Sequence, residues 1–76
     1  MYHTLIFLDE MVIDVAVSPK LPLERVRLRK GSRLAAQVKP YVLETEAGPV
    51  EVADLFFADG SSVSGVRFEL FSFADL

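Results

Sequence analysis

Short apolar segments rich in Val, Leu, Ile and Phe recur along this 76-residue chain, and turn-forming residues interrupt them about every eight to twelve positions. Strands joined by short turns produce this spacing, whereas alternating strands and helices need a longer period. The pattern predicts an all-β fold, namely a small antiparallel barrel or curved sheet of about six strands, of the SH3-like or small-barrel type. An α+β fold is the alternative. The length is that of a single domain, residues 1–76.

Several segments outside residues 23–39 have the character of strands, and in the second of them Ile13, Val15 and Val17 are expected to face one way. Asp59-Gly60 is the strongest turn signal in the chain. The candidate strands are residues 3–8, 11–17, 41–46, 50–57, 61–65 and 66–73.

Residues 23–39 admit two interpretations. A helix over 23–30 would begin at Pro22 and end at Gly31, but its apolar residues lack the three-four spacing of a helix. A hairpin with a turn at 30–32 would place Leu28 opposite Leu34, with apolar side chains on one face. We favour the hairpin. A short helix over 33–38 remains an alternative.

Charge is distributed unevenly: six of the eight bases lie in residues 25–39, and seven acids follow Lys39. The hairpin would align four guanidinium groups, which suit phosphate recognition. This candidate anion-binding or nucleic-acid-binding face consists of Arg25, Arg27, Arg29 and Arg33, with Tyr41 nearby in the sequence.

The acidic segments supply a competing interpretation of the same bases. With Ala47-Gly48 at the tip of the next hairpin, Leu43 would face Val52 and Glu44 would face Glu51. Directly opposed acids are unfavourable unless cations lie nearby. We therefore expect salt bridges from the arginines to Glu44 and Glu51 first, a protein interface second and nucleic acid third, since the net charge of −3 opposes binding to a polyanion.

The C-terminal segment is apolar on both of its expected faces. A strand of this kind needs two covers, of which the chain's own core supplies one. We expect a partner to supply the other, through Phe68, Leu70, Phe71 and Phe73.

Size and composition favour an oligomer. A chain this short forms only a marginal core, and without cysteine it has no disulfides or thiolate metal sites. Yet 51% of its residues are hydrophobic, and self-association would bury the surplus. The scarcity of Asn, Gln, Cys and Met fits either adaptation to heat or a biased base composition.

The usual catalytic patterns are missing from the sequence: it has one His, no Cys and no glycine-rich phosphate loop. No apolar segment approaches the length of a membrane span, and the first residues do not resemble a signal peptide. We therefore expect a non-catalytic interaction or assembly module in the cytoplasm, without cofactor or metal. Its expected partner is a second copy or another protein, and nucleic acid is the runner-up.

Overall fold

A computed structural model describes residues 1–75 of the chain. Within this range the secondary structure consists of seven strands and one 3₁₀ turn, which confirms the all-β prediction. The elements are β1 (His3–Phe7), β2 (Met11–Val15), β3 (Glu24–Leu28), β4 (Arg33–Thr45), β5 (Gly48–Phe56), β6 (Ser62–Arg67), the 3₁₀ turn η1 (Phe68–Leu70) and β7 (Phe71–Phe73).

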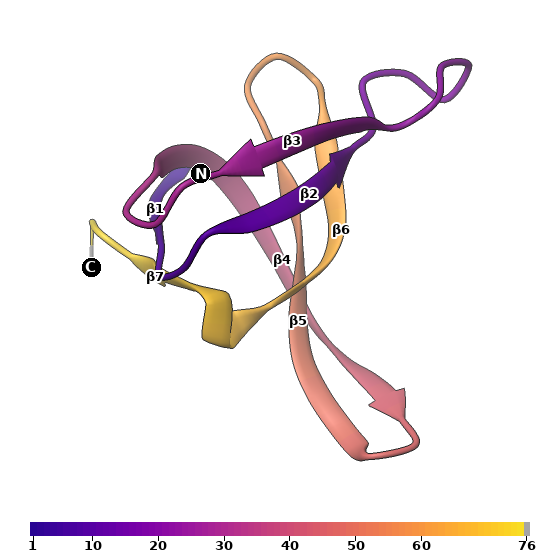
Figure 1. The fold of residues 1–76 in the computed structure, drawn as a ribbon, viewed down its shortest axis with the longest axis vertical. Coiled ribbons are helices and arrows are strands. Elements are labelled where there is room, and N and C mark those ends of the chain that lie inside the picture. The colour runs from indigo at the N-terminus through magenta and orange to yellow at the C-terminus, as the bar shows by residue number, and fades with distance from the viewer. Residues whose placement is uncertain (76) are drawn as a thin grey trace.

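Five strands form one antiparallel sheet in the order β6-β5-β4-β1-β7 (Figure 1). The 13-residue β4 belongs to two strand pairs, because residues 33–36 pair with β1 and residues 37–45 pair with β5. A long strand follows the twist of its sheet, so the two pairs cross and the sheet curves around its concave face. The fold is the curved-sheet form of the predicted architecture, and the sheet does not close into a barrel.

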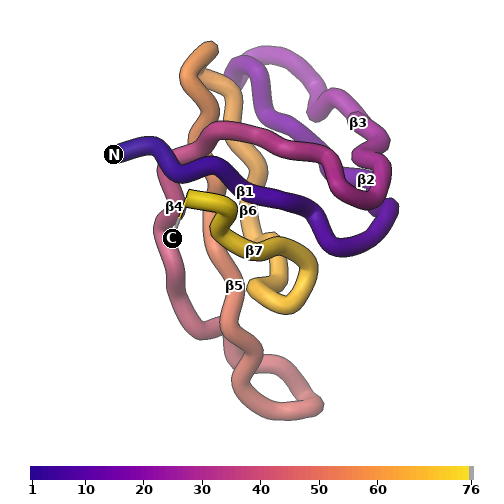
Figure 2. Tube along the Cα trace, turned by 90° about the vertical axis from the view of Figure 1, so that its left-hand side faces the viewer, coloured from indigo at the N-terminus to yellow at the C-terminus, as the bar shows by residue number. Residues whose placement is uncertain are grey.

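The remaining two strands, β2 and β3, form a hairpin that lies against the curved sheet (Figure 2). Ala16 and Ser62 join this hairpin to the sheet through two backbone hydrogen bonds, of 2.7 and 3.0 Å. The N–H groups of Phe7 and Gly31 bond across the other end, to the carbonyls of Ser32 and Phe7. These links hold the hairpin at both ends.

The predicted hairpin within residues 23–39 is wrong, although residues 24–28 do form a strand. β3 pairs with the preceding strand, β2, in antiparallel orientation, so Leu28 lies opposite Met11 and Val26 lies opposite Ile13. The same alternation of apolar residues is satisfied, and Asp14 of β2 and Glu10 just before it lie near arginines of β3. The pairing with β2 thus matches both the apolar face and the charged face.

The short helix considered for residues 33–38 is also not formed, because these residues begin β4. Leu34, Ala36 and Val38 turn toward the core, and Ala36 is fully buried. The residues between them are exposed. This period of two belongs to a strand with one buried face.

The β4–β5 hairpin has a different register from the predicted one. Leu43 lies opposite Val50 and Glu44 lies opposite Pro49, so Glu44 does not oppose Glu51. Gly48, with φ of 112°, follows the two-residue tip, and the Thr45 hydroxyl donates a hydrogen bond of 2.7 Å to its carbonyl oxygen. A glycine at this position fixes the tip at residues 46–47, because few other residues adopt a positive φ.

The core lies between the curved sheet and the β2–β3 hairpin. Leu5 and Phe7 of β1 are fully buried, as is Leu55 of β5. The hairpin contributes Ile13, Val15 and Leu28. Each of these hairpin residues is less than a tenth exposed, so the hairpin acts as the second layer of the fold.

Candidate functional site

The arginines of β3 have acidic partners on the β2 side of their own hairpin. Arg25 Nε lies 3.5 Å from Asp14 Oδ1, and Arg27 Nε lies 3.0 Å from Glu10 Oε1. All four side chains are more than half exposed. Such pairs contribute only ~0–1 kcal/mol each, so their main effect is to help select the register of β2 against β3. The acids that neutralise these arginines are therefore not the predicted Glu44 and Glu51.

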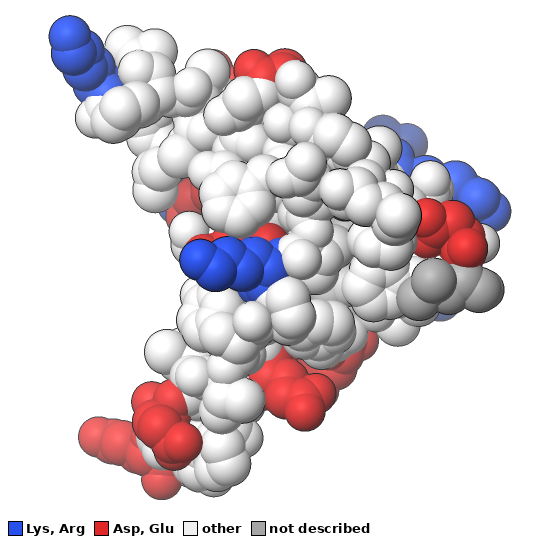
Figure 3. Space-filling view, turned by 180° about the vertical axis from the view of Figure 1, so that it is seen from behind, with Lys and Arg blue, Asp and Glu red and all other residues white. Residues whose placement is uncertain are grey.

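The other members of the predicted basic face lie elsewhere. Arg29 and Arg33 flank the connection between β3 and β4, and no ion pair within residues 1–75 involves either of them. Figure 3 shows bases near this connection and acids around the far end of the β4–β5 hairpin. The structure therefore does not assemble the four arginines into one ribbon face.

Tyr41, the aromatic residue assigned to that face, instead bonds to Asp54. Its hydroxyl donates a hydrogen bond of 2.9 Å to Asp54 Oδ1, which also accepts one of 3.0 Å from the backbone N–H of Gly65. Asp54 lies where the β5–β6 register shifts. The hydrogen bond to the carboxylate raises the pKa of the Tyr41 phenol. This cluster supports the strand irregularity and holds the Tyr41 hydroxyl against β5.

The C-terminal aromatic residues contribute mainly to the interior. Phe71 is only 3% exposed, with its ring centroid 5.2 Å from that of Phe68 and 5.9 Å from that of Phe73. Phe68, Leu70 and Phe73 are half-buried. The 3₁₀ turn interrupts the strand before Phe71, so the predicted alternation from Phe68 to Phe73 is broken.

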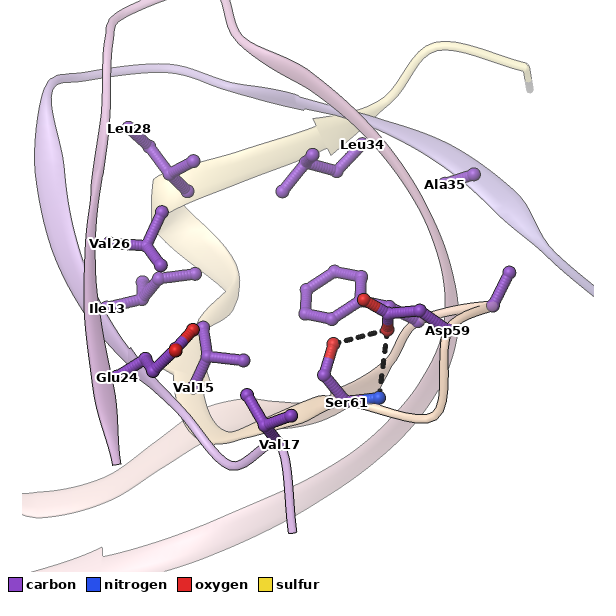
Figure 4. Close-up of a pocket in the computed structure, with 12 residues that line it drawn as sticks. Ile13, Val15, Val17, Glu24, Val26, Leu28, Leu34, Ala35, Asp59 and Ser61 are labelled. Carbon is purple, nitrogen blue, oxygen red and sulfur yellow. Dashed lines mark hydrogen bonds between the residues drawn. The ribbon is translucent and has the colours of Figure 1, made fainter. Parts of the chain in front are cut away.

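An open cleft of about 370 Å³ lies between the β2–β3 hairpin, the start of β4 and the β5–β6 turn (Figure 4). Its wall is mainly aliphatic, and Glu24 and Asp59 approach from different sides of it. The residues that line it are Ile13, Val15, Val17, Glu24, Val26, Leu28, Leu34, Ala35, Phe57, Ala58, Asp59 and Ser61. Small-ligand and anchor pockets have volumes of about this size.

Asp59 is held in place by the turn that it begins. Its Oδ1 accepts hydrogen bonds from the hydroxyl and the backbone N–H of Ser61 (Figure 4). These bonds lower the pKa of the Asp59 carboxyl, and the bond from the Ser61 hydroxyl has the larger effect. The group is therefore ionised near neutral pH, and the cleft has an apolar wall beside negative charge. This composition suits an aliphatic group that carries a cation.

Sequence reasoning did not predict the cleft, although one signal pointed toward it. The predicted common face of Ile13, Val15 and Val17 is the face that lines it. The opposite walls come from Leu34 and Phe57, which only the tertiary fold brings near β2. Among residues 1–75, no group of three or more His, Asp or Glu side chains is placed to hold a metal ion.

No protein-family model, curated protein or solved structure matches the chain. Within residues 1–75, no helix has the length and apolar character needed to cross a membrane.

Proposed function

We propose that this chain is a non-catalytic protein-interaction module that assembles with copies of itself. One observation carries the proposal: within residues 1–75, twelve large apolar side chains are exposed, as many as the hydrophobic residues buried in the core. The exposed set is Met1, Tyr2, Leu8, Val12, Val17, Leu21, Leu23, Val26, Tyr41, Val42, Leu43 and Phe56.

Seven of these twelve residues lie in two parts of the chain. Four of the twelve residues, from Val17 to Val26, lie on or beside the cleft. Three more, Tyr41, Val42 and Leu43, lie on the projecting end of the β4–β5 hairpin, residues 41–50, here called the arm (Figure 1). Gathered apolar side chains are typical of contact surfaces, whereas scattered ones are not. Burying them contributes about 25 cal/mol per Å² before the costs of association.

The C-terminal residues predicted for the interface contribute less to the proposed contact than the sequence suggested. Phe71 belongs to the core and is withdrawn from the contact. Phe68, Leu70 and Phe73 are half-buried and remain candidates for the edge of a contact. The chain does expose many apolar side chains, but the large exposed ones lie outside residues 68–73.

Binding of nucleic acid is the second candidate, and the structure favours it less. Arg25 and Arg27 have acidic partners within 3.5 Å, so fewer guanidinium groups are available for phosphate. Arg29 and Arg33, which take part in no ion pair within residues 1–75, are the arginines through which phosphate binding can be tested.

We further propose that the module works in the cytoplasm, which its lack of cysteine permits, and that its composition reflects adaptation to heat.

Sedimentation equilibrium over a wide range of protein concentration tests the self-assembly. We expect a mass that rises to a multiple of 8.5 kDa. A constant mass of 8.5 kDa at every concentration would contradict the proposal. In parallel, a gel-shift assay with single-stranded DNA and RNA at low salt should show no complex. A shift that disappears in Arg29→Ala/Arg33→Ala would favour the second candidate instead.

A further inference from the structure

The loop between β2 and β3 projects from the body and presents two leucines to solvent. Leu21 is 59% exposed and Leu23 is 60% exposed. The backbone N–H of Leu21 donates to the Ser18 carbonyl at 3.1 Å, and that of Lys20 donates to the Ser18 hydroxyl at 3.3 Å. We call residues 18–23 the knob.

The knob has a restricted backbone before any partner arrives. Pro19 and Pro22 fix φ near −65° at two of its six positions, and the bonds to Ser18 close its turn. A segment that is already ordered loses less conformational entropy on binding. The exposed leucines therefore lie on a segment that is already ordered before binding.

The cleft has the complementary chemistry. Its wall is aliphatic, and Glu24 and the ionised Asp59 border it (Figure 4). The knob offers two leucines and, beside them, Lys20. Neither leucine lines the cleft of its own chain, so this cleft is open to the knob of another copy.

Other projecting parts of the chain fit the cleft less well. The arm carries Glu44 and Glu46 near its tip, and these acids would approach Glu24 and Asp59 with like charge. The connection between β3 and β4 carries bases, but its central residues, 29–33, are all polar or glycine. Only the knob combines exposed leucines with a cation among these three segments.

We propose that the knob of one copy docks into the cleft of a second copy, with Leu21 and Leu23 against the aliphatic wall and Lys20 near Glu24 and Asp59. This inference rests on the self-assembly proposed above and names its contact. Val17 and Glu24, which flank the knob in the sequence, both line the cleft. Knob and cleft are thus neighbours on one surface, so a two-fold axis beside them inserts both knobs at once and closes the assembly as a dimer.

Substituting the leucines tests the apolar part of the contact. Leu21→Ser/Leu23→Ser should raise the dissociation constant of the dimer by at least about tenfold. The matched control, Leu8→Ser/Val12→Ser, changes two exposed apolar residues outside both the cleft and the arm and should leave that constant unchanged. A third variant, Val42→Ser/Leu43→Ser, tests the arm as the alternative contact. All three pairs are at the surface, and circular dichroism verifies that each variant is folded.

Exchanging charges tests the direction of the contact. Lys20→Glu and Glu24→Lys should each weaken self-association by about fivefold, the scale of an exposed ion pair. An equal mixture of the two variants should form a heterodimer more tightly than either variant forms a homodimer, because the Lys20→Glu knob then meets the Glu24→Lys cleft and the unaltered Lys20 knob meets the unaltered Glu24 cleft.

The outcomes separate the two proposals. A wild-type chain that is monomeric throughout defeats the proposed function, and the docking with it. A wild-type oligomer that is unaffected by the leucine substitutions, or that the arm variant dissociates instead, defeats the docking alone. Loss of association in the leucine variant, together with recovery in the charge-exchanged mixture, supports the docking.

Discussion

Gly65 shows how one residue sets the path of a strand in this protein. Its φ is +69°, and its N–H donates to Asp54 at the point where the β5–β6 register shifts. Two residues of β6 there face one of β5, and a bulge of this kind bends a strand and increases its twist. The Tyr41 hydroxyl meets the same carboxylate, so the backbone conformation and the side-chain bonds support one another.

Gly65→Ala should lower the free energy of unfolding by about 1–2 kcal/mol, the cost of a left-handed conformation for a residue with a Cβ. A Cβ at this position would lie 3.8 Å from the Tyr41 hydroxyl oxygen, an ordinary contact, so the loss is conformational and not steric. Urea denaturation measures it. Gly65→Asn is the control and should lose less, since Asn tolerates this conformation better. Equal losses for Ala and Asn would contradict this explanation.

The phenol of Tyr41 should titrate above its ordinary pKa of 10.0, because its hydrogen bond to the Asp54 carboxylate favours the protonated form. The bond therefore contributes stability below the ordinary pKa, and this contribution is lost as the pH rises through the raised value. Ultraviolet titration of Tyr2→Phe, in which Tyr41 is the remaining tyrosine, gives the midpoint. Adding Asp54→Asn should lower that midpoint, and an unchanged midpoint would show that the bond does not form in solution.

At the scale of elements, β4 divides the sheet into a supported part and an unsupported part. Residues 33–36 pair with β1, which pairs in turn with β7, whereas residues 41–45 pair only with residues 48–52 of β5. Every residue from 41 to 47 is exposed. An isolated two-stranded hairpin is at best marginally stable in water, so the arm depends on its continuity with the body.

Backbone amides in the arm should exchange with solvent far faster than those of the body. We expect protection factors for residues 42–45 that are roughly a hundredfold below those of residues 34–36, because the arm can open without disturbing the core. Hydrogen exchange followed by NMR in dilute solution gives both values for one strand, which serves as its own control. Equal protection along β4 would mean that the arm is covered or is part of the cooperative core.

At the scale of the whole molecule, the C-terminal segment completes the core. β7 pairs with β1, and the Phe71 ring lies 6.1 Å from that of Phe7. The two ends of the described chain thus meet at one side of the sheet (Figure 2). Loss of this segment should affect folding before it affects association.

Phe71→Ala should lower the free energy of unfolding by about 3–5 kcal/mol, because it leaves a cavity among aromatic rings. In a domain of this size that loss leaves much of the chain unfolded. Phe56→Ala, at a position that is 40% exposed, is the matched control and should cost about 1 kcal/mol or less. Thermal denaturation together with sedimentation equilibrium distinguishes the two roles: a Phe71→Ala variant that stays folded but sediments with a smaller mass would restore Phe71 to the interface.

Local patterns predicted what depends on neighbours in the sequence. The period of two in residues 11–17 predicted the buried face of β2, and Asp59-Gly60 predicted the turn that Asp59 and Gly60 form. The failures concern the choice of partner. β3 had two apolar partners of suitable alternation, and the turn at residues 30–32 favoured the wrong one. The arm hairpin could turn at residues 47–48 or at 46–47, and the bond from Thr45 to the Gly48 carbonyl supports the second, which is the one that forms.

Alternation and composition are properties of the chain alone, and they predicted an all-β fold with more apolar side chains than its own core holds. The location of the exposed apolar residues depends on the tertiary structure. That structure placed Phe71 inside, paired Arg25 and Arg27 with acids of their own hairpin, and left Leu21 and Leu23 exposed beside an apolar cleft. Burial depends on which distant strands pack together, and that packing is settled by the register of the whole sheet.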